Sequence, residues 1–280
     1  MRRRDFVRRA AALVAANALT RPLAGAERLP GLPGLPGIQL YTLRSLMAQD
    51  LEATLAAVAG IGYREVEFAG YFGRPPGEIR RSLAATGLSA PSAHVDFPLE
   101  GPEWQQTMDD ALAAGHRFVI LAWLPPERRA PLDAWRRLAD QLNQAGEAAR
   151  RQGLEMGYHN HDFEFQPLEG RLPYDLLLER TDPALVTFEL DLYWISRAGH
   201  DPLAYFQKAR GRFRQVHVKD MAAGAGREMV DPGDGVLDFP TLLAAAATAG
   251  VRHFFVEHDE PRDPLGTARA GYTALHRILG

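Results

Sequence analysis

The chain has 280 residues, of which 46% are hydrophobic and 24% are charged, and its formal net charge is −3. This composition is typical of a globular protein with a large core. The small negative charge gives no general attraction to nucleic acid or to an anionic membrane. Because the sequence contains no cysteine, it excludes disulfides, cysteine-ligated zinc, iron–sulfur clusters and cysteine nucleophiles.

Residues 1–26 resemble an export signal. Arginines at positions 2–4 precede Asp5, Phe6 and Val7, an order similar to the twin-arginine signal. A short run rich in Ala, Leu and Val then ends in Ala24-Gly25-Ala26, as at cleavage sites. The run is too short to span a bilayer core of about 30 Å comfortably, and a basic amphipathic surface helix is the alternative. We expect a periplasmic or otherwise exported protein, and a cytoplasmic one if the signal does not function.

The next segment repeats Leu-Pro-Gly three times between residues 29 and 37. Proline has no backbone N–H to donate and glycine is conformationally permissive, so the repeat favours neither a helix nor a strand. We therefore expect a linker over residues 27–36 and one folded domain over residues 37–280.

Short apolar segments alternate with amphipathic segments through the rest of the chain. The short segments, rich in β-branched, aromatic and aliphatic residues, are typical of strands. They are Ile38–Leu43, Arg64–Phe68, Ser89–Val95, Phe118–Ala122, Leu154–His159, Val186–Asp191, Phe213–Val218 and His253–Glu257. The segments between them predict helices, several of which begin with Pro or end before Gly. They are Leu51–Gly60, Gly77–Thr86, Glu103–Ala114, Leu132–Gln152, Pro173–Arg180, Pro202–Arg210, Pro240–Ala249 and Pro264–Leu279.

Eight strand–helix units in a chain of this length predict an α/β fold, a single-domain (β/α)8 TIM barrel. The main rival is an open doubly wound sheet, which would have fewer strands and a glycine-rich phosphate turn after the first one. The sequence contains neither GxGxxG nor GxxxxGK[ST], so nucleotide-binding interpretations lose their best support.

Polar residues recur at alternate positions near the ends of the predicted strands. Since strand side chains alternate between two faces, one set faces the helices and the other fills the barrel. The alternation directs a set of side chains with ionisable or amide groups into the barrel, near the end where barrel active sites lie. This set comprises Glu65, Glu67, His159, His161, Glu189, Asp191, Gln215, His217, Lys219 and Glu257.

Four of these residues form a candidate metal shell, namely His159, Asp191, His217 and Glu257. Isolated buried charges cost several kcal/mol each, and one divalent cation would compensate several of them. Two imidazoles and two carboxylates suit Mn, Zn, Co or Fe better than Mg or Ca. Each residue alone could instead be structural, and Lys219 could neutralise Asp191 or Glu257 without a metal.

At these residues the chain resembles the xylose-isomerase-like TIM-barrel superfamily, the sugar phosphate isomerase/epimerase family. The resemblance covers residues 37–280 and is strongest in four segments: Tyr158–Phe165, Glu189–Trp194, Val216–Met221 with Gly233–Gly235, and Phe255–Asp259. The family's usual shell of Glu, Asp, His and Glu implies metal-ligating roles for Asp191, His217 and Glu257. At the first position this chain has His159, so one Glu of the acid–base pair of the family's epimerases is missing here.

Such a site supports removal of a proton from a carbon next to a carbonyl, with the metal stabilising the enediolate as charge develops. We expect Glu257 to be the general base, His159 or His161 to assist in proton transfer, and Lys219 to contact substrate oxygens. Candidate substrate contacts are His94, Glu67, His161 and Trp194. We expect the partner to be a small carbohydrate. We expect no nucleic acid partner and, once a signal is removed, no membrane partner. Self-association is left open.

Several reaction outcomes remain compatible with this chemistry. Reprotonation gives an isomerase or epimerase, which is the expected activity, whereas loss of a neighbouring leaving group gives a lyase acting on keto-glycosides. A nuclease like endonuclease IV would need more metal ligands and a basic groove. A sugar-binding protein without catalysis is the remaining alternative.

Overall fold

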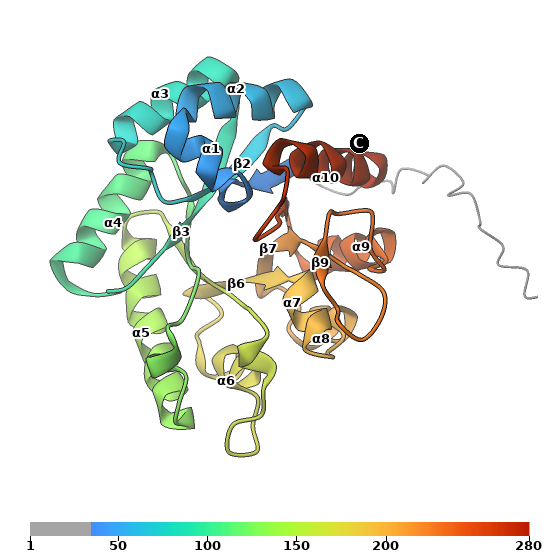
Figure 1. Cartoon of the computed structure of the whole chain (residues 1–280). Coiled ribbons are helices and arrows are strands. Elements are labelled where there is room, and N and C mark those ends of the chain that lie inside the picture. The colour runs from blue at the N-terminus through green and yellow to red at the C-terminus, as the bar shows by residue number, and fades with distance from the viewer. Residues whose placement is uncertain (1–34, 280) are drawn as a thin grey trace, which may run out of the picture.

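The structure, a computed structural model, describes residues 35–279. Eight parallel strands close into a barrel in the order β1-β10-β7-β6-β5-β4-β3-β2, and the helices surround them (Figure 1). The barrel strands are β1 Pro36–Gln39, β2 Glu65–Ala69, β3 Ser89–Val95, β4 Phe118–Leu121, β5 Glu155–His159, β6 Val186–Asp191, β7 Phe213–Val218 and β10 His253–Val256. The predicted TIM barrel is therefore confirmed.

The helices that cover the barrel follow the strands in chain order. They are α1 Arg44–Gln49, α2 Leu51–Ile61, α3 Pro76–Thr86, α4 Gly101–Ala114, α5 Leu132–Arg151, α6 Pro173–Arg180, α7 Leu192–Arg197, α8 Pro202–Lys208, α9 Phe239–Ala249 and α10 Pro264–Leu279. Short 3-10 turns cover Leu40–Leu43, Pro126–Arg128 and Phe163–Phe165. In the part of the chain that the structure describes, no helix combines the length and apolar character that a membrane crossing requires.

The first predicted strand is wrong at its C-terminal end. The alternating segment from Ile38 to Leu43 favours a strand, but β1 ends at Gln39 and a 3-10 turn follows. The Gln39 side chain accepts a hydrogen bond from the backbone N–H of Tyr41 and so caps that turn. Leu40 and Leu43 are buried from the turn instead of from a strand. The predicted signal and nearly all of the predicted linker lie outside the described residues.

Strand alternation divides the core from the barrel interior as the sequence predicts. Outward side chains, such as those of Val66, Met156 and Val218, are fully buried in the layer between strands and helices. Two inward glycines make room for bulky neighbours inside the barrel. A Cβ atom on Gly37 would lie 2.5 Å from the Phe255 ring, and one on Gly157 would lie 2.4 Å from Ile120. The rest of the interior is largely polar.

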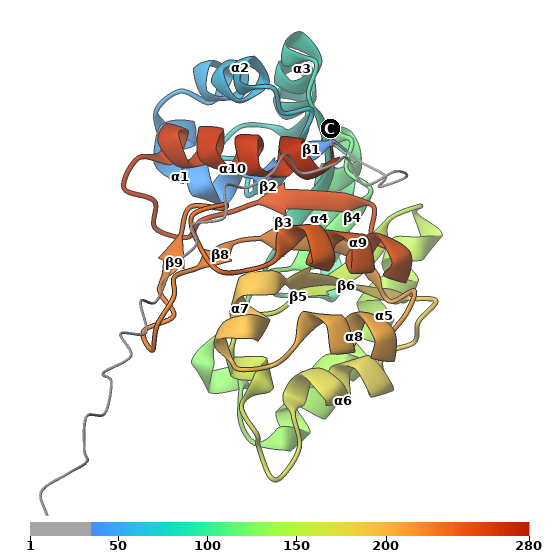
Figure 2. The ribbon, with the colours of Figure 1, turned by 90° about the vertical axis from the view of Figure 1, so that its right-hand side faces the viewer.

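A two-stranded hairpin, β8 Asp220–Met221 with β9 Met229–Val230, follows β7 directly. Figure 2 shows it projecting from one end of the barrel. The Asp220 carboxylate accepts hydrogen bonds from the backbone N–H groups of Met221, Gly233, Gly235 and Leu237 at 2.8–3.2 Å. This buried carboxylate holds both ends of the loop together and explains the Gly-Asp-Gly segment at residues 233–235.

Candidate active site

Three of the four predicted metal ligands meet at the carboxyl ends of neighbouring strands. Asp191 ends β6, His217 lies on β7 and Glu257 directly follows β10. One potential ligand atom from each lies within 4.8 Å of the other two, and all three residues are buried. The β6–β7 register pairs Asp191 with His217, so the sheet itself sets two of the three positions.

Unpartnered atoms point into this cluster. Oδ2 of Asp191, Nδ1 of His217 and Oε2 of Glu257 are buried and form no hydrogen bond of good geometry, although Nδ1 of His217 lies 2.6 Å from Oε2 of Glu257. The Lys219 ammonium is 3.1 Å from Asp191 Oδ2, 2.8 Å from Glu257 Oε2 and 2.6 Å from Asp259 Oδ1. The cluster therefore fits a divalent cation by donor type, and Lys219 supplies part of the charge compensation.

Asp191 is held in place by its own chain. Its Oδ1 accepts a hydrogen bond at 2.8 Å from the backbone N–H of Trp194 and caps α7. The Asn160 side chain accepts a hydrogen bond at 3.0 Å from the Asp191 N–H. With Oδ1 engaged at the helix N-terminus, Oδ2 is the oxygen left to meet His217 and Glu257.

Beneath the cluster lie two fully buried carboxylates, Glu67 and Glu189. His217 Nε2 is 2.7 Å from Glu67 and 3.1 Å from Glu189. His94 Nε2 is 3.3 Å from Glu67 and 3.0 Å from Glu189. His159 Nδ1 is 3.1 Å from Glu189. Two buried anions are thus tolerable because three imidazoles surround them.

His159 departs from the predicted shell. Its Nε2 approaches Asp191 Oδ2 only to 4.0 Å, and it falls outside the cluster of Asp191, His217 and Glu257. Instead, it groups with His94, Glu189 and His217, whose potential ligand atoms lie within 4.8 Å of one another. The structure therefore brings together three of the predicted ligands and places His159 beside them.

The pKa values of three histidines beside the cluster are shifted in opposite directions. Burial lowers the pKa of His94, but Glu67 and Glu189 outweigh it and raise that pKa to about 10. Burial, assisted by Lys219, lowers the pKa of His161 to about 3. Burial and the charge of His217 hold the pKa of His159 well below its usual range. His94 is therefore a cation near neutral pH, whereas His159 and His161 are neutral.

The two carboxylates of the cluster also differ. Burial raises the pKa of Asp191 to about 6, although Lys219 and His217 act in the opposite direction. Burial would raise the pKa of Glu257 as well, but Lys219 and His217 lie closer and hold it below its usual range. Glu257 is therefore ionised near neutral pH.

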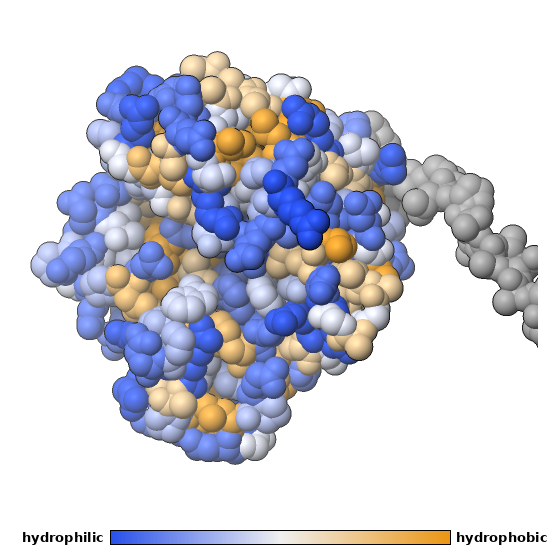
Figure 3. Space-filling model, in the orientation of Figure 1, coloured by the Kyte–Doolittle hydropathy of each residue, from blue (hydrophilic) through white to orange (hydrophobic). Residues whose placement is uncertain are grey.

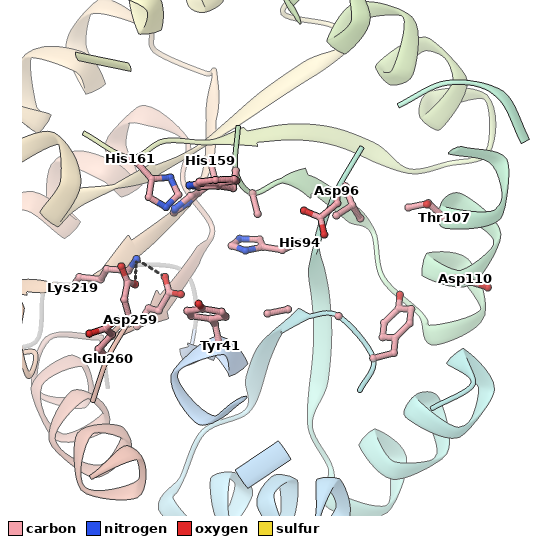
Figure 4. A pocket seen from close by; sticks show the side chains of 17 residues that line it. Tyr41, His94, Asp96, Thr107, Asp110, His159, His161, Lys219, Asp259 and Glu260 are labelled. Atoms are coloured by element: carbon pink, nitrogen blue, oxygen red, sulfur yellow. Dashed lines mark ion pairs between the residues drawn. The ribbon is translucent and has the colours of Figure 1, made fainter. Parts of the chain in front are cut away.

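A pocket of about 660 Å³ opens beside the cluster. Of the predicted site residues, His94, His159, His161 and Lys219 line it (Figure 4), and Glu257 is also part of the lining. Asp191 and His217 lie behind this lining and are buried.

Two predicted substrate contacts are placed elsewhere. Glu67 is fully buried against Gln39, Ser92 and His217 and does not line the pocket. Trp194 is also absent from the lining, and its ring packs near His161 and Lys219. Both residues contact groups that reach the pocket, and neither lines it in this structure.

Other site residues received no role from the sequence. Asp259 binds Lys219 at 2.6 Å and is two positions beyond Glu257, so the same alternation could have indicated it. Further residues line the pocket from loops, from the 3-10 turn Leu40–Leu43 and from α4, namely Tyr41, Tyr71, Asp96, Thr107, Asp110 and Trp123. Loops carry no periodic pattern, so no comparable signal existed for most of these residues.

The fold and the site together define a (β/α)8 barrel with a candidate metal centre at the carboxyl ends of its strands. A family model described as xylose isomerase-like TIM barrel matches residues 55–277. The chain belongs to this family.

The relatives carry several activities. An inosose dehydratase from Geobacillus thermodenitrificans is 25% identical over 250 residues, covering 76% of this chain and 83% of that protein. A sugar phosphate isomerase/epimerase structure from Parabacteroides distasonis has a TM-score of 0.76 at 25% identity, covering 94% of this chain and 98% of the other. The structure of IolI with a bound zinc atom has a TM-score of 0.71 at 14% identity, covering 88% and 98%, which shows a shared fold.

Proposed function

We propose that this protein is a metal-dependent carbohydrate enzyme that removes a proton from a carbon next to a carbonyl group. One observation carries the proposal: Asp191, His217 and Glu257 are buried beside the pocket, and one potential metal-ligand atom from each lies within 4.8 Å of the other two. The relatives support it, since they include sugar isomerases or epimerases and a dehydratase. The zinc in the IolI structure supports a divalent metal in this fold.

Asp191, His217 and Glu257 would hold the metal, and His159 would stand beside them. A bound divalent cation polarises a carbonyl oxygen and stabilises negative charge that develops on it. The chain's own contribution begins with Lys219, whose ammonium lies on the pocket wall next to Glu257 and Asp259. It positions substrate oxygens and reduces the cost of gathering three carboxylates at one place.

Glu257 is the proposed general base. Its carboxylate lines the pocket, whereas the Asp191 carboxylate does not. Glu257 is ionised near neutral pH and faces the pocket, so its carboxylate is the one placed to accept the carbon-bound proton. His161, which is neutral and has a buried Nδ1 without a hydrogen-bond partner, is the second group able to exchange a proton with a bound sugar.

Two fates of the resulting carbanion follow from this site. In the first, a proton returns to the other face or to the neighbouring carbon, which makes the protein an epimerase or isomerase. In the second, a leaving group departs from the next carbon, which makes it a lyase. The second fate is favoured by the inosose dehydratase relatives and by His159 at the position where the family's epimerases carry Glu.

Two alternatives to the proposed enzyme are a nuclease and a sugar-binding protein, and the charge of the pocket argues against the nuclease. Its described lining includes Asp96, Asp110, Glu257, Asp259 and Glu260, and such an acidic wall would repel nucleic acid phosphates. A sugar-binding protein without catalysis would exchange no carbon-bound proton with solvent, whereas the proposed enzyme would.

Solvent deuterium exchange tests the proposal. Purified protein loaded with Mn²⁺ or Zn²⁺ is incubated in D₂O with free ketoses, inososes and 3-keto-glycosides. We expect deuterium at a carbon next to the carbonyl and a loss of about 10²–10⁴-fold in Glu257→Gln, with full activity in Glu228→Gln, an exposed loop variant. Fully metal-loaded protein that exchanges no carbon-bound proton in any of these compounds would contradict the proposal.

We also propose that the protein acts outside the cytoplasm, because residues 1–26 resemble an export signal. Fusion of residues 1–36 to a reporter that is active only after export tests this. Replacement of Arg3 and Arg4 by Lys should abolish export, and a reporter that stays inside with the native sequence would contradict it.

A further inference from the structure

The pocket extends well beyond the cluster of Asp191, His217 and Glu257. In Figure 4, Lys219, Asp259 and Glu260 lie at one end, Thr107 and Asp110 on α4 lie at the other, and His94 and Asp96 lie between them. Pockets of about 300–1,000 Å³ hold drug-sized ligands, so one sugar ring at the cluster would leave much of the 660 Å³ unfilled.

We define the outer arm of the pocket as Tyr71, Asp96, Thr107, Asp110 and Trp123. Tyr71 stacks on His116 with ring centroids 5.8 Å apart, which fixes the plane of its ring. Burial and the nearby Asp110 carboxylate raise the pKa of Tyr71, so its hydroxyl stays a hydrogen-bond donor. The outer arm therefore offers hydroxyl and carboxylate groups next to a flat ring.

Trp123 completes the outer arm from the loop after β4. The β3–β4 register pairs Val95 with Leu121, so Trp123, two residues after Leu121, lies one position further along than Asp96, the residue after Val95. Its side chain is 43% exposed, although the guanidinium of Arg129 lies 4.8 Å from its ring. An exposed indole that is held in place presents an apolar face to a sugar ring and an N–H to its hydroxyls.

The charge of the pocket selects against phosphate. In many TIM barrels, the loops after strands seven and eight bind phosphate. Here, apart from Lys219, the loop residues from those two strands that reach the pocket are Glu257, Asp259 and Glu260. Lys219 is already paired with three carboxylates, and Nε2 of His94 lies 3.0–3.3 Å from Glu67 and Glu189. Each basic side chain of the described lining that lies within 4 Å of a carboxylate would therefore have to give up that partner to bind a phosphate group.

We propose that the substrate is an uncharged glycoside of at least two units. The ring that carries the carbonyl lies at the cluster with Glu257 and Lys219, and the second unit lies in the outer arm. This inference rests on the proposed function for the identity of the reacting ring, whereas the binding of a second unit is tested separately. It excludes sugar phosphates, in contrast to the description of the Parabacteroides distasonis relative.

Binding measurements on the Mn²⁺-loaded full chain test this inference. The probes are 3-keto-cellobiose with two rings, 3-keto-glucose with one ring, and fructose 6-phosphate. We expect the two-ring probe to bind at least about tenfold more tightly than the one-ring probe, as one or two extra hydrogen bonds and a stacked ring would produce. Fructose 6-phosphate should bind most weakly.

Variants of the outer arm locate the second unit. Trp123→Ala and Asp110→Asn should each weaken binding of the two-ring probe about tenfold more than binding of the one-ring probe. Asp109→Asn is the matched control, because Asp109 and Asp110 each accept one hydrogen bond from a glutamine one turn earlier and Asp109 does not line the pocket. It should change neither affinity.

The outcomes separate the two proposals. Equal weakening of both probes, no weakening of either, or tightest binding of fructose 6-phosphate would overturn the inference. Selective binding of the two-ring probe without any deuterium exchange would support the inference and contradict the proposed function. Exchange in the one-ring probe, with no preference for two rings, would contradict the inference alone.

Discussion

Nε2 of His217 lies 2.7 Å from Oε2 of Glu67, on the side of the imidazole that faces away from Glu257. An ionised carboxylate can only accept a hydrogen bond, so this contact places a hydrogen on Nε2. Burial opposes the ionisation of Glu67, but His94 and His217 lower its pKa well below the usual range. Glu67 thus fixes the ring and leaves Nδ1 directed toward Asp191 and Glu257, an arrangement that orients metal-ligating histidines.

Replacing Glu67 by Gln should weaken metal binding without removing a ligand. We expect a loss of about 10–100-fold in metal affinity, as is usual for partners of ligating histidines. The measurement is titration of the metal-free protein with Mn²⁺ or Zn²⁺. Glu65→Gln is the control, since Glu65 lies on the same strand and pairs with His253 at 2.9 Å away from the cluster. Equal metal affinity of the two variants would show that Glu67 does not position His217.

Lys219 and a metal compensate the same carboxylates, so Lys219→Met should make folding depend more strongly on metal. Removing one member of a buried ion-pair group costs about 3–5 kcal/mol because the remaining charges are uncompensated. Thermal unfolding with and without Mn²⁺ should therefore show a lower Tm for the metal-free variant and a larger metal-induced rise than in the native protein. Lys208→Met, which removes an exposed ammonium paired with Asp175, should show neither effect. An unchanged Tm for metal-free Lys219→Met would contradict this account.

Much of the fold could be predicted because short apolar strands alternate with helices, several of which end at a glycine. β3, β6 and β7 match their predicted bounds residue for residue. α7 could not be predicted, because it begins at Leu192 directly after β6 with no intervening turn residue. Asp191 ends the strand and caps the helix at once, and neither role is visible from periodicity.

The sequence predicted which side chains face the barrel interior, but it did not predict which of them reach the pocket. Alternation correctly directs Glu67, Glu189 and Glu257 into the barrel, yet only Glu257 reaches the pocket. The difference arises from strand stagger: Glu67 pairs with Gln39 and Ser92 in mid-barrel, whereas Glu257 follows the end of β10. Stagger is a property of the closed sheet, and a single strand's pattern does not contain it.

Gly235 is required by the carboxylate that holds the loop after β7. A Cβ atom there would lie 2.2 Å from Asp220 Oδ1 and 2.5 Å from the Met221 carbonyl oxygen. Gly235→Ala should therefore destabilise the protein by about 1–3 kcal/mol, the usual cost of overpacking, and should increase proteolysis within residues 221–238. Gly226→Ala in the same loop meets no atom closer than 3.6 Å and is the control. Urea unfolding that finds the two variants equally stable would contradict the steric argument.

Glu164 gives the folded protein a predictable response to pH. It is fully buried and accepts hydrogen bonds from the Tyr158 hydroxyl at 2.7 Å and the His161 N–H at 2.9 Å. Burial outweighs these bonds and raises the pKa of Glu164 from 4.5 to about 8. Between these two values the folded chain keeps a proton that the unfolded chain has released, so rising pH lowers stability. The contribution is fully present below pH 4.5 and is lost as the pH rises through about 8.

Glu164→Gln removes this titration while keeping an uncharged side chain that can bond to the same two groups. The stability of the native protein relative to the variant should therefore fall by up to about 1.4 kcal/mol per pH unit between about pH 5 and 8. Urea unfolding at several pH values measures this difference. Glu179→Gln, which alters a carboxylate that is 56% exposed and paired with Arg171, should show no such slope. A stability difference for Glu164→Gln that stays constant from pH 5 to 8 would mean that the buried carboxyl does not hold its proton in the folded state.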